Sequence, residues 1–256
     1  MFTDIHCHLN DEKYQDKADV VAKAREAGVD RLICAGYDMA STYAAKELAE
    51  RFDEVYFTAG IHPDAEREAT KENLAALKKL CAHEKCVAVG EIGLDYHYQP
   101  LDKEGQMRAF AAQVELAGEV SLPFVVHSRD CTQDLLSFLR SHEPLLQRGF
   151  VMHCFSGSSE TAQVLLKLGA YISFAGPLTF KNSKNLPQVA ALVPKDRILT
   201  ETDSPYLAPH PFRGETNQPA NVSYVTEKLA EIRGVDAAQI AAAVRENAKR
   251  IFYRMV

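Results

Sequence analysis

The chain has 256 residues, of which 46% are hydrophobic and 25% are charged, the composition of an ordinary globular protein. Its 29 basic and 35 acidic side chains give a formal net charge of −6, which argues against non-specific binding to nucleic acid through a broadly basic surface. No apolar run approaches the roughly 20 residues of a membrane span, and the first residues lack the pattern of a secretory signal. We therefore expect one domain over residues 1–256, a cytoplasmic location, and no membrane or obligate protein partner.

Short apolar segments alternate with helix-like segments along the whole chain. The strand candidates are rich in Val, Ile and Phe, as buried parallel strands are; they are Thr3–His8, Arg31–Ala35, Val55–Ile61, Cys86–Glu91, Phe124–His127, Phe150–Cys154, Ala170–Phe174 and Ile198–Asp203. The helix candidates carry apolar stripes at helical spacing; they include Glu104–Val120, Asp134–Leu139, Thr161–Leu168, Asn221–Ile232 and Asp236–Phe252. Asp236 is the expected N-cap of the last helix, and Ala208–Pro219 is expected to be a long loop.

This alternation predicts an α/β protein that folds as a single (β/α)₈ barrel, the TIM barrel. An open doubly wound sheet is the alternative, but the first strand candidate is not followed by a Gly-x-Gly-x-x-Gly turn. The six cysteines are scattered and form no Cys-x-x-Cys pair, so we expect them to be reduced and mostly buried.

Two histidines separated by one residue lie in the first strand candidate. Side chains two positions apart in a strand point to the same face, so His6 and His8 are expected to lie side by side. At that spacing one metal ion can take both imidazoles. Neighbouring Cys7, and Cys154 in a later strand, are expected to point the opposite way and not to coordinate.

Four more potential ligands end later strand candidates: Glu91, His127, His153 and Asp203. In a barrel these strand ends meet at the C-terminal mouth, where active sites are built. Four imidazoles and two carboxylates exceed the need of one tetrahedral ion and suit two divalent ions bridged by a carboxylate. Mixed ligands of this kind favour Zn²⁺ or Mn²⁺ over Mg²⁺, and the sequence leaves the choice among the three open. Such a site carries local positive charge that attracts phosphate.

Sequence blocks spanning nearly the whole chain resemble the TatD family of metal-dependent deoxyribonucleases, within the amidohydrolase-type barrels. The matching blocks are Asp4-Ile5-His6-Cys7-His8-Leu9, Gly60-Ile61-His62-Pro63, Gly90-Glu91-Ile92-Gly93-Leu94-Asp95-Tyr96, His127-Ser128-Arg129, His153-Cys154-Phe155-Ser156-Gly157-Ser158, Thr179-Phe180-Lys181-Asn182, Glu201-Thr202-Asp203-Ser204-Pro205-Tyr206-Leu207 and Arg213-Gly214-x-x-Asn217-x-Pro219. The resemblance implies the same six metal ligands, namely His6, His8, Glu91, His127, His153 and Asp203. The chain departs from the family pattern at Asn10, where Asp is common, and at Gln218, where Glu is common. Both departures bear on the choice of substrate more than on catalysis.

Individual roles follow from position. We expect Asp203 to be both a ligand and the general base, and Glu91 to be the bridging ligand. Glu201, two residues before Asp203, is expected to orient a ligand from behind. Four residues are candidates for substrate contacts, with an ordinary surface position as the alternative for each: His62, Arg129, Lys181 and Arg213.

The resemblance implies a 3′-to-5′ exodeoxyribonuclease that hydrolyses DNA phosphodiester bonds with a metal-activated water, acting on single-stranded 3′ ends. The alternative keeps the same site but changes the bond, because some members of the family deacylate D-aminoacyl-tRNA. Attack on a carbonyl and attack on a phosphoryl group need similar ligands, so the ligand set does not separate an ester or amide hydrolase from a nuclease. A barrel protein that binds a ligand without catalysing a reaction is disfavoured, because all six metal-ligand positions carry residues able to bind metal.

Overall fold

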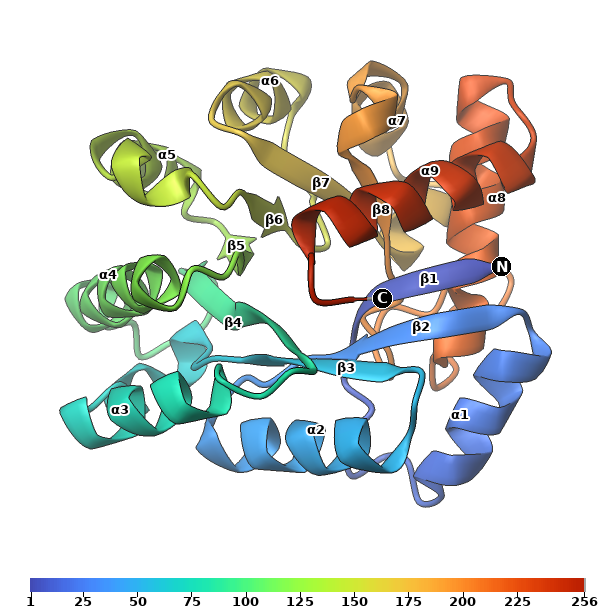
Figure 1. The fold of residues 1–256 in the computed structure, drawn as a ribbon. Helices are drawn as coiled ribbons and strands as arrows, with labels where there is room; N and C mark the ends of the chain where they lie inside the picture. The colour runs from blue at the N-terminus through green and yellow to red at the C-terminus, as the bar shows by residue number, and fades with distance from the viewer. Residues whose placement is uncertain (256) are drawn as a thin grey trace.

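The computed structural model describes residues 1–255 and contains eight parallel strands that form one sheet in sequence order (Figure 1). The strands are β1 (Phe2–Cys7), β2 (Val29–Cys34), β3 (Val55–Ala59), β4 (Cys86–Asp95), β5 (Phe124–Arg129), β6 (Phe150–Met152), β7 (Ala170–Phe174) and β8 (Ile198–Thr200). The sheet curls into a nearly closed barrel, which confirms the predicted TIM barrel.

The helices surround the strands (Figure 1). The α-helices are α1 (Lys17–Glu26), α2 (Met39–Arg51), α3 (Lys71–Leu80), α4 (Lys103–Val120), α5 (Thr132–Ser141), α6 (Ser159–Lys167), α7 (Leu186–Leu192), α8 (Val222–Arg233) and α9 (Ala237–Ile251). Short 3₁₀ helices are η1 (Pro63–Glu68), η2 (Glu143–Leu146), η3 (Gly176–Thr179), η4 (Lys195–Arg197) and η5 (Pro219–Asn221). Within residues 1–255, none of these helices has the length and apolar character needed to span a bilayer.

Local sequence explains where helices begin and what fills the core. Asp236 forms a capping box with Gln239 at the start of α9, as predicted, and satisfies backbone N–H groups that the helix itself cannot. Phe124 and Phe150, from neighbouring strands, are fully buried and stack with ring centroids 5.3 Å apart. Each such ring contributes about 1.5–3 kcal/mol through burial. The five cysteines other than Cys154 are buried, and all six are free thiols, as expected.

The seam between the last and first strands is joined by a buried side chain. The Asp4 carboxylate accepts hydrogen bonds from the Thr202 backbone N–H (2.9 Å) and hydroxyl (2.5 Å). Beside it, the Asp203 N–H donates to the His6 carbonyl (3.0 Å) and the His8 N–H donates to the Ser204 carbonyl (2.7 Å). The segment after β8 is therefore fixed against the segment that carries both N-terminal histidines.

Several expected strand ends differ from the structure, and those of β4 and β8 matter most for the positions of the expected ligands. Glu91 does not end its strand: β4 continues to Asp95 because Ile92–Asp95 pair with β5 beyond a register shift. The continuation requires glycine at position 93, since a Cβ there would lie 2.0 Å from the His127 carbonyl oxygen. The eighth strand was expected to run to Asp203, but β8 ends at Thr200. Asp203 therefore lies in a loop and has a left-handed backbone conformation (φ 55°).

Candidate metal centre

All six expected ligands meet at the C-terminal mouth of the barrel. Together with His62 they form three overlapping groups of three residues, and within each group the donor atoms lie within 4.8 Å of one another. The groups are His6 with His8 and Asp203, His6 with Glu91 and His153, and His62 with Glu91 and His127. We call these seven residues the ligand cluster. His62 follows β3 and was expected only as a substrate contact, so the structure brings it closer to the other ligands than the sequence indicated.

Glu91 lies at the centre of the cluster and faces two groups of imidazoles. Its Oε2 lies 3.3 Å from His6 Nε2 and 3.8 Å from His8 Nε2. Its Oε1 lies 2.9 Å from His153 Nε2 and 3.0 Å from His127 Nδ1. A carboxylate with each oxygen directed to a different set of donors has the geometry of a bridging ligand.

Two further carboxylates hold imidazoles from behind. Glu201 Oε1 lies 3.0 Å from His153 Nδ1 and also accepts the Cys154 backbone N–H at 2.8 Å. Asp95 Oδ2 lies 3.0 Å from His127 Nε2. Outer carboxylates of this kind fix the ring orientation of a metal-binding histidine and increase its basicity.

The arrangement at Glu201 agrees with the role expected of it, whereas sequence reasoning assigned Asp95 no role. The signal was present, because Asp95 lies four positions after Glu91 and therefore on the same face of a strand. Ending the strand at Glu91 concealed that relation.

The cluster has the donor chemistry of a metal site. His6 is 1% exposed, and its Nε2 is buried with no hydrogen-bond partner, although it points toward the Glu91 carboxylate. A buried polar atom without a partner costs about 1–3 kcal/mol, and a coordinated cation would remove that cost. Imidazole and carboxylate donors gathered in this way fit Zn²⁺, Mn²⁺ or a similar divalent ion.

The carboxylates and imidazoles of the cluster shift one another's pKa values, which keeps the carboxylates ionised and able to bind a cation. Burial alone would raise the pKa of Glu91, but the His153 and His6 imidazoles and hydrogen bonds from His127 and His153 lower it well below its usual range. Burial alone would lower the pKa of His153, but the Glu91 and Glu201 carboxylates raise it well above its usual value. Without metal, Glu91 and Glu201 therefore favour the protonated form of the His153 imidazole. A divalent ion that binds this imidazole would displace the proton.

Asp203 has a similar balance. Burial would raise the pKa of its carboxyl, but the hydrogen bond from His8 and the charges of His153, His8 and His6 lower it. Its Oδ1 lies 3.3 Å from His8 Nε2 and 3.7 Å from His6 Nε2. Asp203 is therefore ionised at neutral pH and is able to bind a cation or accept a proton.

His62 is a neutral imidazole at pH 7. Burial lowers its pKa to about 4, despite the opposing influence of Glu91. Its Nδ1 accepts the Asp64 backbone N–H (3.2 Å), so the remaining proton is on Nε2, 3.7 Å from Glu91 Oε1. At pH 7 this imidazole is a hydrogen-bond donor rather than a cation.

The cluster forms the base of a cleft of about 780 Å³. Arg129 and His62 line the cleft, and Arg129 donates to the Tyr98 hydroxyl (3.0 Å) while its guanidinium lies 5.0 Å from the centre of that ring. Among residues 1–255, Lys181 and Arg213 are not in the cleft lining, and Arg213 instead lies over Phe180 (4.4 Å).

The expected orientation of Cys154 is wrong. Cys154 lies beyond the end of β6 with a positive φ (41°), so strand alternation does not direct it away, and it lines the cleft. Cys7 is buried, and its thiol donates to the Ile33 carbonyl (3.5 Å).

Comparison with known proteins identifies relatives along the whole chain. The family model for TatD related DNases matches residues 3–253. The uncharacterized metal-dependent hydrolase YabD of Bacillus subtilis strain 168 is 44% identical over 253 residues, which cover 98% of this chain and 99% of the relative. A Shigella flexneri serotype 5b protein named 3′-5′ ssDNA/RNA exonuclease TatD is 34% identical over 257 residues, covering 97% of this chain and 98% of the relative. The crystal structure of the TatD homologue YjjV from Escherichia coli K12 matches with a TM-score of 0.93 at 31% identity, covering 98% of both chains.

A TIM barrel with this cluster at its C-terminal mouth, related over its full length to such proteins, is a metal-dependent hydrolase. More specifically, the chain belongs to the TatD family, as its sequence blocks predicted.

Proposed function

We propose that this hydrolase is a 3′-to-5′ exonuclease that cleaves phosphodiester bonds of single-stranded DNA with two divalent ions, Zn²⁺, Mn²⁺ or Mg²⁺, in the ligand cluster. The observation that carries the proposal is Glu91, whose two oxygens face separate sets of imidazoles at the base of an open cleft. The choice of DNA is supported by the relative named as a single-stranded DNA and RNA exonuclease.

Divalent ions held by the six ligands would lower the pKa of a coordinated water and offset the charge of the reacting phosphate. The chain itself supplies the base. The Asp203 side chain is 14% exposed whereas that of Glu91 is 4% exposed, so Asp203 is the carboxylate better placed to exchange a proton with a group in the cleft. Glu91, enclosed by imidazoles, serves as the bridge.

The cleft wall offers contacts for one strand. The Arg129 guanidinium, supported by Tyr98, is placed to bind a phosphate through two parallel hydrogen bonds. Tyr206 is partly exposed, its hydroxyl donates to Asp11 (2.7 Å), and the Lys13 ammonium lies over its ring, 4.2 Å from the centre, where it would add positive charge beside a bound strand. Lys181 and Arg213, outside the cleft lining, would contact only a more distant part of the strand.

The test uses a 5′-labelled single-stranded oligonucleotide and protein of measured metal content. We expect a ladder that shortens from the 3′ end, loss of activity after chelation and desalting, and recovery with Mn²⁺, Zn²⁺ or Mg²⁺. A bulky 3′ block should stop degradation.

Three outcomes would contradict the proposal. Full activity in protein shown by elemental analysis to be free of metal would remove the role of the cluster. Rapid cutting of a covalently closed single-stranded circle would indicate an endonuclease. Inactivity on DNA, with fast release of amino acid from D-aminoacyl-tRNA, would assign the site to hydrolysis of carboxylic esters instead of phosphodiesters.

A further inference from the structure

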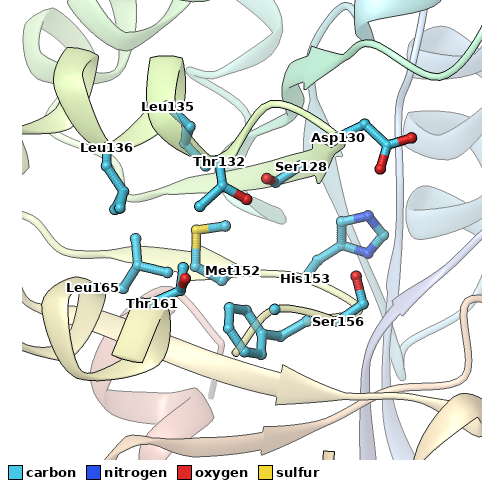
Figure 2. A pocket seen from close by; sticks show the side chains of 12 residues that line it. Ser128, Asp130, Thr132, Leu135, Leu136, Met152, His153, Ser156, Thr161 and Leu165 are labelled. Carbon is cyan, nitrogen blue, oxygen red and sulfur yellow. The ribbon is translucent and has the colours of Figure 1, made fainter. Parts of the chain in front are cut away.

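A second cavity lies beside the cleft, between α5 and α6, with His153 of the ligand cluster in its wall (Figure 2). Its volume is about 160 Å³. Three residues, Ser128, His153 and Ser156, line both this cavity and the cleft. We call it the side pocket. Because His153 is a wall of both spaces, a group in the side pocket lies next to a group bound at the cluster.

The side pocket has a mixed lining of apolar and polar side chains. The apolar ones are Leu135, Leu136, Met152, Phe155 and Leu165, and the polar ones are Ser128, Asp130, Thr132, His153, Ser156 and Thr161 (Figure 2). A ring with apolar faces and polar edges satisfies both parts, because the faces contact the leucine and methionine side chains while the edge atoms reach hydroxyl groups. Nucleobases have this character, whereas a purely aliphatic group would make no hydrogen bond to the Thr132 and Ser156 hydroxyl groups.

The volume favours one ring over two. An apolar cavity of about 150 Å³ in another protein holds one benzene molecule, so a pocket of about 160 Å³ admits a single six-membered ring. A purine carries a second fused ring, which requires the walls to move. Those walls are well packed: a Cβ on Gly157 would lie 2.7 Å from Cζ of Phe155, so the Phe155 ring already fills the space on that side.

We propose that the side pocket binds the base of the 3′-terminal nucleotide and that it selects pyrimidines over purines. This inference rests on the proposed exonuclease function. The side pocket is the more enclosed and smaller of the two spaces, whereas the cleft is open and about 780 Å³ in volume. The terminal nucleotide therefore enters the side pocket, and the rest of the strand leaves through the cleft past Arg129 and Tyr206. The hydroxyl groups in the lining both donate and accept, so they pair with thymine and cytosine alike, and the volume of the pocket alone separates pyrimidines from purines.

The experiment compares initial rates of removal of the terminal nucleotide from oligonucleotides that differ only in the 3′-terminal base. For the metal-loaded protein we expect kcat/KM to be about tenfold higher for thymine and cytosine than for adenine and guanine, the scale of discrimination that a size-limited pocket provides. Thymidine 5′-monophosphate should also compete more strongly than deoxyadenosine 5′-monophosphate. The preference should follow the terminal base and not the one before it.

Substitutions at Leu136, a half-buried residue of the pocket wall, separate this pocket from the rest of the site. Leu136→Ala enlarges the pocket and should bring the pyrimidine-to-purine ratio close to one by accelerating purine removal. Leu136→Phe fills the pocket and should slow pyrimidine removal about fivefold or more. Leu166→Ala, the same change at a half-buried leucine of α6 outside the lining, should leave the ratio unchanged.

Each alternative result has a distinct meaning. Equal rates for all four terminal bases, or a ratio that Leu136→Ala leaves unchanged, would overturn the pocket assignment and leave the exonuclease proposal standing. A preference that follows the penultimate base would overturn the assignment to the terminal nucleotide. Failure to cleave any of the oligonucleotides would overturn the proposed function, and the pocket assignment with it.

Discussion

The two halves of the ligand cluster hold their imidazoles by different means. Around β5 and β6, His127 and His153 each lie between Glu91 and an outer carboxylate, Asp95 or Glu201. Around β1 and β8, the buried Nε2 of His6 has no hydrogen-bond partner, and the segment is fixed by backbone contacts across the seam. The first half is organised by side-chain contacts to its imidazoles, whereas the second half leaves the buried His6 Nε2 without a hydrogen bond, a donor atom that a bound ion would satisfy.

This difference indicates that substitutions in the two halves of the ligand cluster should have different effects on catalysis and on metal binding. Loss of a residue near β1 and β8 should act directly on chemistry or on occupancy by an ion. Loss of an outer carboxylate near β5 and β6 should weaken binding of an ion by allowing an imidazole to rotate.

The largest effect is expected from Asp203→Asn, which should lower kcat by roughly 10² or more because an amide does not accept the proton. Circular dichroism should show an intact fold. His6→Ala is the comparison in the same half, and elemental analysis should show that it loses bound metal instead. Near wild-type turnover in Asp203→Asn would remove Asp203 from the role of base.

Next in size are the outer carboxylates. Glu201→Gln and Asp95→Asn should each weaken metal binding by about 10- to 100-fold, measured by competition with a chromogenic chelator, because each keeps the shape but loses the charge that orients an imidazole. Asp134→Asn is a matched control, since Asp134 lies on α5, accepts a hydrogen bond from the Tyr96 hydroxyl and is not a member of the ligand cluster. If the control weakened binding equally, net charge rather than orientation would explain the effect.

The seam offers a smaller, structural test of the other half. Asp4→Ala removes the acceptor of both Thr202 hydrogen bonds and leaves buried donors without partners, which should cost about 3 kcal/mol of unfolding free energy. Urea denaturation measures this cost. Because the seam fixes His6, His8 and Asp203, we also expect faster hydrogen exchange there than around β5. Uniformly faster exchange throughout the barrel would show that the seam stabilises the whole fold and not this half.

Much of the cluster could be predicted because barrel topology alone brings strand ends together, so His6, His8, His127 and His153 needed only a correct strand count. Asp95 and Asp4 were not assigned roles, because their partners depend on the register of β4 and on closure of the seam, which are tertiary properties. The positions of Lys181 and Arg213 outside the cleft lining depend on loop paths that no periodicity encodes. The side pocket likewise results from packing between α5 and α6, and one sequence does not reveal a gap of that size.

The smallest expected effect concerns pH and separates the metal-free state from the loaded one. The Glu91 and Glu201 carboxylates, opposing the effect of burial, raise the pKa of His153 above its ordinary value of 6.5. Protonation of His153 therefore stabilises the metal-free fold fully below pH 6.5, and this contribution is lost as pH rises toward the raised pKa, by up to about 1.4 kcal/mol per pH unit for one proton. Glu91, whose pKa is lowered, is ionised throughout this window and adds no slope.

Between about pH 6 and pH 8, below the range in which cysteine thiols ionise, the melting temperature of chelated protein should consequently fall by a few degrees. That of metal-loaded protein should stay level or rise, because ions bind the deprotonated imidazole. Glu201→Gln should reduce the slope of the chelated protein without abolishing it, because the pKa values of His8 and His127 are raised by other carboxylates, while Asp134→Asn should leave the slope unchanged. A slope in Glu201→Gln equal to that of the wild type would mean that Glu201 does not hold the proton on His153, and that the half around β5 and β6 is not organised by its outer carboxylates in the way its geometry indicates.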